Sequence, residues 1–92
     1  MKKIWEQIKR ENWIQGHNAV NKNGQPVVPR GRAAVRLCAA GWIDKVYRRP
    51  GSAWNARLTL MSATGIKSIP EWNDFHGRTI EQVRAAFKKA NL

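Results

Sequence analysis

Residues 31–49, with the sequence GRAAVRLCAAGWIDKVYRR, are the most informative segment of the chain. Its Ala, Leu and Arg residues favour a helix. On a helix, successive residues are roughly 100° apart around the axis. With that spacing, the apolar residues before Gly41 lie on one face and those after Gly41 lie on a different face. A continuous central helix would bury one side early and the other late; the alternative is a break at Gly41, where Gly costs about 1 kcal/mol against Ala. We favour the continuous helix, which should end before Pro50-Gly51.

Upstream, the sequence predicts a short helix over residues 2–11, with an apolar face of Ile4, Trp5 and Ile8. Residues 17–20 and 26–28 are short extended candidates on either side of Asn21–Gly24. Asn-Gly between two short runs indicates a β-hairpin. Pro26 and Pro29 limit the second run to a sheet edge or a loop.

Downstream, residues 53–63 are predicted as a helix whose apolar face is Trp54, Leu58 and Met61. Leu58-Thr59-Leu60 keeps a strand alternative open. Residues 69–70 and 73–78 are predicted as loop. Thr79 begins a last helix, because Thr79 and Gln82 have the spacing of a capping box. Its apolar positions recur at helical spacing: Ile80, Val83, Phe87 and Ala90.

Together these elements predict the fold class. The 92 residues are enough for a single domain over 1–92. We expect a small, mainly α domain, with a minor β part, of about four helices and a short β-hairpin after the first helix.

The charge of the chain is its strongest functional signal. Seventeen Lys and Arg against six Asp and Glu give a net charge of +11 and a pI near 11.0. Such a surface favours a polyanion or an acidic protein as partner. Residues 30–49 hold six bases and one acid, Asp44, but a straight helix would divide those bases between two faces. The candidate binding residues are Arg30, Arg32, Arg36, Lys45, Arg48 and Arg49.

Five Trp residues provide either core or stacking surfaces. Trp5, Trp42 and Trp54 fit apolar helix faces and are predicted to be core. Trp13 follows the first helix with no apolar pattern to place it. It is therefore the candidate exposed aromatic of the binding surface.

The chain lacks the pattern of a catalytic or metal site. Cys38, His17 and Asp74 are the right residue types for hydrolysis, but they have no family spacing. Cys38 lies among Ala and Leu, where a buried thiol is inert. Trp72-Asn73-Asp74 is interpreted as structural, with Trp72 in the core, an Asx-type turn, and Asp74 close enough to pair with Arg78. We expect no enzyme activity, no metal and no cofactor.

Three pieces of the sequence occur in a familiar order: Trp13-Ile14-Gln15-Gly16, Cys38-Ala39-Ala40-Gly41, and Trp72-Asn73-Asp74 followed by Arg78-Thr79. The order resembles a family of small bacterial and phage proteins of unknown function, over about residues 2–90. Residues 50–66 match no part of that pattern. The resemblance implies a mostly helical fold and a phage or prophage origin, and it brings no catalytic residue.

Two function classes follow. The first is a non-enzymatic protein that binds DNA or RNA, mostly without sequence preference. The second is a phage anti-defence factor, such as an anti-CRISPR, that docks on an acidic surface or nucleic-acid channel of a host protein or nucleoprotein. No apolar run has membrane-spanning length and no signal-peptide core begins the chain, so the expected location is the cytoplasm, the host's if the protein is phage-encoded.

Overall fold

The computed structural model describes residues 2–92. In chain order these residues form helix α1 (Ile4–Gln7), a 3-10 turn (Arg10–Asn12), strands β1 (Ala19–Val20) and β2 (Arg36–Leu37), and helices α2 (Ala39–Val46), α3 (Pro50–Thr64), α4 (Ile69–Asp74) and α5 (Ile80–Lys89). The predicted fold class, mainly α with a small antiparallel pair of strands, is confirmed.

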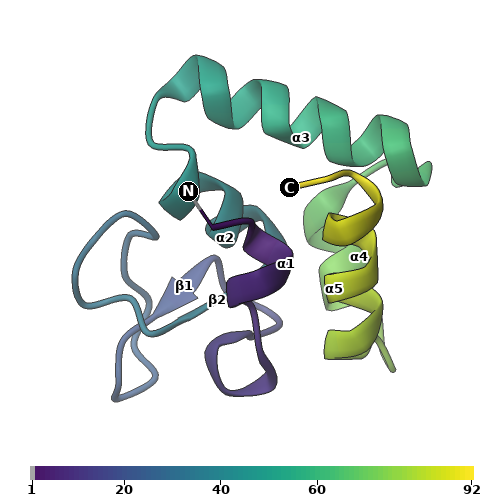
Figure 1. The fold of residues 1–92 in the computed structure, drawn as a ribbon. Coiled ribbons are helices and arrows are strands. Elements are labelled where there is room, and N and C mark those ends of the chain that lie inside the picture. Colours follow the sequence, from purple (N-terminus) through teal and green to yellow (C-terminus); the bar gives the residue numbers. More distant parts are fainter. Residues whose placement is uncertain (1) are drawn as a thin grey trace.

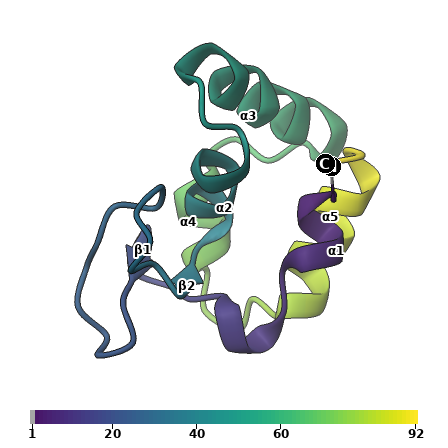
Figure 2. The same cartoon turned by 60° about the vertical axis from the view of Figure 1, so that its left-hand side comes forward.

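The helices surround one core. α3 lies across the top of the molecule in Figure 1, and α2, α4 and α5 lie beneath it. Figure 2 shows α1 beside α5, on the other side of the core from the strands. The two chain ends meet there, since the Trp5 amide donates to the Leu92 carbonyl at 3.1 Å. The largest fully buried side chains include Phe87, Ile4 and Ile43.

The continuous helix over residues 31–49 is wrong. Helix α2 begins only at Ala39 and ends at Val46, while residues 31–38 form turns and strand β2. Tertiary contacts override the helix propensity of this Ala-rich segment. Leu37 is buried, pairs with Ala19 of β1 and also bridges to Trp13.

The alternative break at Gly41 is wrong too, because Gly41 lies inside α2. A Cβ at Gly41 would collide with the carbonyl oxygen of Asn18. Gly41 is therefore needed for a close approach of helix and loop, which is a common reason for Gly inside an element.

The predicted hairpin forms only in part. Asn21–Gly24 does make a turn, in which the Gly24 amide donates to the Asn21 carbonyl at 2.9 Å. Beyond the turn, however, only an isolated bridge joins Val20 and Pro26. The strand that pairs with β1 is β2, in the register Ala19↔Leu37 and Val20↔Arg36. Pro26 cannot donate to a ladder, which limits the shorter pairing.

The predicted helix over 53–63 is confirmed and is longer, since Pro50 occupies its first turn and Gly65, at φ 78°, ends it. Its predicted buried face is wrong. Ala53, Ala56 and Leu60 face the core, whereas Trp54 and Leu58 are 61% and 45% exposed. Apolar residues lie all around this helix, so their spacing did not identify the buried side.

Residues 69–70 and 73–78 were predicted as loop, which is wrong for residues 69–70 and 73–74, because they belong to helix α4. Ser68 caps α4, its hydroxyl accepting from the Glu71 amide at 3.4 Å, and Pro70 lies in the first turn. The capping box that begins α5 is confirmed: Thr79 and Gln82 exchange side-chain to backbone bonds of 3.2 and 3.0 Å. At the N-terminal end, the helix predicted over 2–11 is shorter, with α1 limited to Ile4–Gln7.

No helix within residues 2–92 combines the length and apolar character needed to cross a membrane.

Candidate nucleic-acid interface

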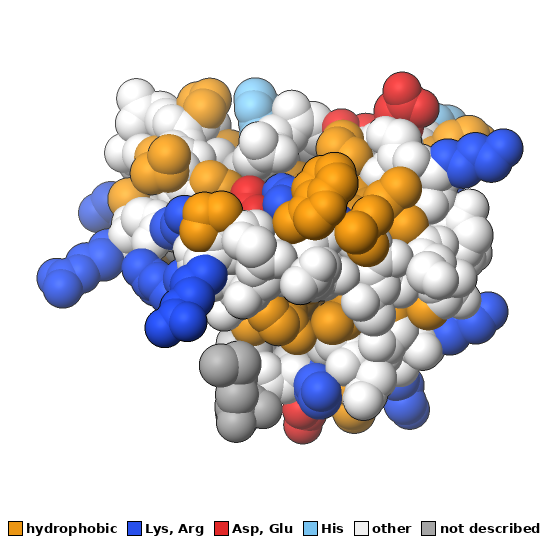
Figure 3. All heavy atoms as spheres, turned by 90° about the horizontal axis from the view of Figure 1, so that it is seen from above, with side chains coloured by type: hydrophobic (Ala, Val, Ile, Leu, Met, Phe, Trp, Pro, Cys, Tyr) orange, Lys and Arg blue, Asp and Glu red, His pale blue; other side chains and the backbone are white. Residues whose placement is uncertain are grey.

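The predicted basic residues lie on four segments. Arg30 and Arg32 are exposed in the loop between β1 and β2, and Arg36 is half-buried on β2. Lys45 is half-buried on α2, and Arg48 and Arg49 are exposed between α2 and α3. All four segments lie toward the left side of Figure 1. Seen from above, Lys and Arg side chains gather at that same end of the molecule (Figure 3). We call this set the arginine side: Arg30, Arg32, Arg36, Lys45, Arg48 and Arg49.

Trp13, the predicted stacking residue, is not part of this surface. Its ring is half-buried against the core, and its Nε1 donates to Asn73 Oδ1 at 2.7 Å. The neighbouring Ile14 amide donates to the Leu37 carbonyl at 3.2 Å, which ties this segment to β2. The prediction of an exposed Trp13 is therefore wrong, because the segment after α1 packs between β2 and α4.

A second basic group, not predicted from the sequence, surrounds Trp5. Arg84 Nε donates to the Trp5 carbonyl at 3.1 Å, and Lys88 Nζ lies 5.2 Å from the centre of the Trp5 ring. The ring is half-buried, and it lines a hollow of about 180 Å³ with Arg84, Ala85 and Lys88. Trp5 was predicted to be core, yet part of its ring is open to solvent beside two cations.

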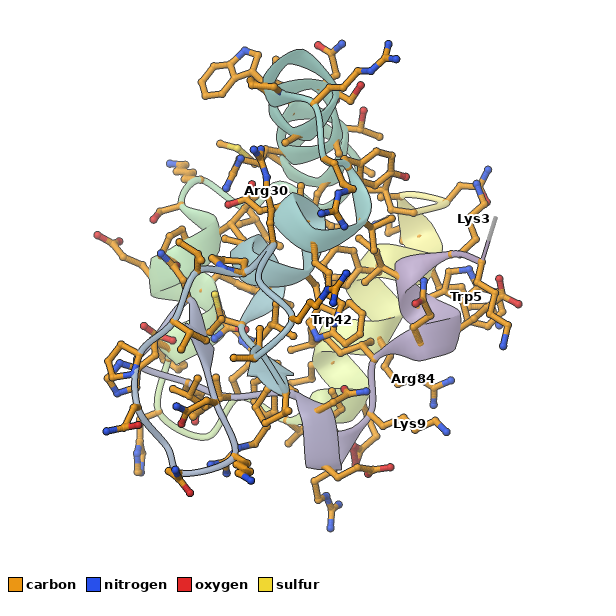
Figure 4. All side chains as sticks on the ribbon, turned by 90° about the vertical axis from the view of Figure 1, so that its left-hand side faces the viewer. Lys3, Trp5, Lys9, Arg30, Trp42 and Arg84 are labelled. Carbon is orange, nitrogen blue, oxygen red and sulfur yellow. The ribbon has the colours of Figure 1, made fainter. Side chains whose placement is uncertain are left out.

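Figure 4 shows Lys3, Trp5, Arg84 and Lys9 following one another along one side of the view. Lys3 is held in place by a 3.0 Å bond from its Nζ to the Asn91 carbonyl. We call this set the Trp5 strip: Lys3, Trp5, Lys9, Arg84 and Lys88. Only the packing of α1 against α5 brings its residues together, so no local pattern in the sequence indicates the strip.

Trp42 lies between the strip and Arg30 in the same view. It is 5% exposed, its Nε1 donates to the Asn12 carbonyl at 3.2 Å, and Lys45 Nζ lies 5.6 Å from its ring centre. Trp42 thus supports the surface from below, as predicted for a core residue. Figure 4 shows Arg30 of the arginine side and the labelled residues of the Trp5 strip on opposite sides of Trp42. We call the arginine side and the Trp5 strip together the basic face.

Carboxylates do little to neutralise this face. Within residues 2–92 the ion pairs are Arg57–Asp44 at 2.9 Å and the exposed Arg10–Glu81 contact at 4.0 Å. Neither involves the arginine side or the Trp5 strip. The cations of this face therefore have no carboxylate partner, and the net charge of +11 can attract an anionic ligand.

The predicted structural role of Trp72-Asn73-Asp74 rests on Asn73. Asn73 is fully buried, and its Oδ1 accepts from Trp13 Nε1 and, at 3.0 Å, from the Ala39 amide. Its Nδ2 donates to the Ile14 carbonyl at 3.1 Å and to Asp74 Oδ1 at 2.9 Å. The amide therefore makes four hydrogen bonds, its full capacity.

Two details of that prediction differ. These residues end helix α4 rather than forming a loop, and Trp72 is only half-buried, with the Arg78 guanidinium 4.4 Å from its ring centre. Asp74 accepts from the Gly16 amide at 2.9 Å instead of pairing with Arg78. Arg78 donates to the Trp72 carbonyl at 2.8 Å.

Cys38, His17 and Asp74 do line one hollow, of about 310 Å³. The thiol there is 3% exposed, donates to Asn18 Oδ1 at 3.7 Å and accepts from the Gly41 amide at 3.4 Å. Burial raises its pKa, so it stays protonated at neutral pH. A protonated, hydrogen-bonded thiol is a poor nucleophile. No group of three His, Cys, Asp or Glu residues in the described chain has the arrangement of a metal site.

Comparison with known proteins places the chain in a family. No curated protein and no solved structure matches it. The model of a family of unknown function, DUF6197, matches residues 2–91, nearly the whole chain. The resemblance to an uncharacterised family is thus confirmed, and the protein belongs to the DUF6197 family of unknown function.

Proposed function

We propose that the protein binds nucleic acid, without catalysis, across the basic face formed by the arginine side and the Trp5 strip. The observation that carries this proposal is the convergence of cations from both ends of the chain around Trp5. Arg84 and Lys88 come from α5, and Lys3 and Lys9 flank α1. A face with many cations and no carboxylate pairs suits a regularly spaced row of phosphates.

The two parts of the face suit different atoms of the ligand. Arginine forms bidentate contacts with phosphate oxygens, and the exposed Arg30, Arg32, Arg48 and Arg49 are free to do so. The Trp5 ring offers an aromatic surface on which an unpaired base can stack. These contacts are made to phosphates and to the flat face of a base, neither of which carries sequence information, so we expect binding with little sequence preference.

Salt dependence tests the proposal. We expect the affinity for a fluorescein-labelled oligonucleotide, measured by anisotropy, to fall by about 10³-fold between about 50 and 200 mM salt if about six phosphates are contacted. Single-stranded and duplex oligonucleotides are compared, because stacking on Trp5 requires an unpaired base. An affinity that changes little over this range would contradict a phosphate-driven mechanism.

That result would favour the other class expected from the sequence, a phage anti-defence factor on an acidic host protein. A pull-down from nuclease-treated lysate then separates the two. Under the nucleic-acid proposal, nuclease treatment removes the captured material. A specific protein complex that survives nuclease would contradict it.

A further inference from the structure

The hollow beside Trp5 combines an aromatic wall with two cations. Its volume is about 180 Å³, and it is lined by Trp5, Arg84, Ala85 and Lys88. Sites for drug-sized molecules measure about 300–1,000 Å³, so this hollow has room for one flat ring rather than for a pair of rings. An aromatic wall attracts the face of a base, and cations at its edge attract the phosphates on either side of that base.

Arg84 holds one phosphate position at a fixed place relative to the ring. Its Nε donates to the Trp5 carbonyl at 3.1 Å, so the guanidinium is tied to the backbone of the residue that carries the ring. Figure 4 shows the two residues next to each other on the same side of the molecule. The side chain is exposed, and its terminal nitrogens remain available for a bidentate contact with phosphate oxygens.

Lys88 covers the ring without being held there. Its Nζ lies 5.2 Å from the ring centre, and no hydrogen bond or ion pair within residues 2–92 fixes the ammonium. Arg78 differs, because the guanidinium that covers Trp72 also donates to the Trp72 carbonyl and to Gln82 Oε1. Stacking of a base on an aromatic ring is stronger than an exposed cation–π contact. A base can therefore replace the Lys88 ammonium over the ring, and the ammonium can move to a phosphate.

We propose that single-stranded nucleic acid is the ligand of the basic face, and that the hollow holds one unpaired base of it. The base stacks on Trp5, and the neighbouring phosphates contact Arg84 and Lys88. This inference rests on the proposed function, in which phosphate contacts bring the strand to the protein. A duplex gains nothing from the hollow, because its bases are paired and stacked, and a base reaches Trp5 only if it is flipped out at a cost in free energy.

An abasic strand separates the base site from attraction to phosphates. Anisotropy compares a labelled dT strand with a strand of equal length in which every residue is abasic, so that the phosphates are the same and the bases are missing. We expect the dT strand to bind about tenfold more tightly or better, with equal salt slopes for the two strands. Equal affinities would overturn the base site and leave phosphate-driven binding intact. A duplex of equal phosphate number that binds more tightly than the dT strand also overturns the inference.

Substitutions of Trp5 assign the preference to the hollow. Trp5→Leu keeps an apolar side chain beside α5 but removes the aromatic face, so the ratio of the two affinities should fall to about one. Trp5→Phe keeps a ring and should retain most of the preference. The ratio is measured on one protein, so a smaller folded fraction in a variant affects both affinities equally.

Trp54→Leu is the matched control, since Trp54 is 61% exposed on α3 and lies outside the basic face. It should retain the full preference for the dT strand. A preference that survives Trp5→Leu would overturn the inference, and so would a loss in Trp54→Leu equal to that in Trp5→Leu.

Discussion

The junction around Asn73 and the basic face around Trp5 are both assembled from distant parts of the sequence. They differ in whether their polar groups have partners within the protein. At the junction, every hydrogen-bonding position of the buried amide has a partner. On the basic face, cations stand without carboxylate partners. The first arrangement stabilises the fold, because a buried polar group must be satisfied. The second contributes little to stability and leaves charge for a ligand.

Breaking the junction should have the largest effect. Asn73→Ala leaves Trp13 Nε1, the Ala39 amide and the Ile14 carbonyl without their partner, and we expect a loss of about 3–5 kcal/mol in the free energy of unfolding. Urea denaturation followed by circular dichroism measures it. Asn55→Ala, on the exposed side of α3, is the control and should change little. A loss below about 1 kcal/mol in Asn73→Ala would show that water replaces the amide.

The contact of α2 with the loop before β1 should be nearly as sensitive. Gly41→Ala places a Cβ against the Asn18 carbonyl, which is backbone and cannot rotate away. We expect a loss of about 3 kcal/mol. Gly51→Ala makes the same chemical change in α3, where no atom lies within 4 Å, and should stabilise the protein by about 0.5–1 kcal/mol. Thermal unfolding of both variants gives the comparison, and equal melting temperatures would disprove the close approach.

The basic face should respond in binding and not in stability. Arg84→Ala and Lys88→Ala are each expected to weaken oligonucleotide binding by about tenfold and to lower the salt slope by about one, with melting temperatures near that of the wild type. Lys67→Ala is the control. It also removes one positive charge, but Lys67 follows the C-terminal end of α3, whereas Arg49 precedes the start of that helix. If Lys67→Ala weakens oligonucleotide binding as much as Arg84→Ala and Lys88→Ala do, the affinity depends on the net charge and not on the Trp5 strip.

The smallest expected effect concerns Cys38. The pKa of this thiol is raised in the folded protein, so its contribution to stability is present below the ordinary pKa of 9.0 and is lost as pH rises above it. Between pH 7 and 10, the free energy of unfolding of the wild type should fall by about 1 kcal/mol more than that of Cys38→Ala. Urea denaturation at both pH values measures the difference. Parallel curves for the two proteins would mean that Cys38 ionises normally when folded.

Local signals predicted α5 well and residues 31–38 badly. The start of α5 depends on Thr79 and Gln82, three residues apart, so the sequence contains its whole cause. The start of α4 has an equally local cause, since Ser68 and Glu71 have the same spacing and Pro70 lies between them. The loop predicted there was therefore wrong although the sequence contains the signal for a helix. Residues 31–38 have high helix propensity, but pairing of β2 with β1 takes precedence.

The candidate interface shows the same division. The arginine side was predicted because its residues are close in sequence. The Trp5 strip was missed because Trp5 and Lys88 become neighbours only when α1 packs on α5. The predicted environments of Trp13 and Trp54 were both wrong. Trp13, predicted to be exposed, bonds to the buried Asn73, sixty residues away. Trp54, predicted to be core, lies outside, because α3 packs its small Ala residues against the core.

The mainly helical class, the capping box of α5, the burial of Cys38 and the excess of positive charge follow from the amino-acid sequence alone. These properties depend on composition or on residues within one helical turn of each other. The tertiary structure determines which Trp rings face solvent, which strand pairs with β1 and which cations lie close together. Those outcomes depend on burial and on contacts across the whole chain, which short-range spacing does not encode.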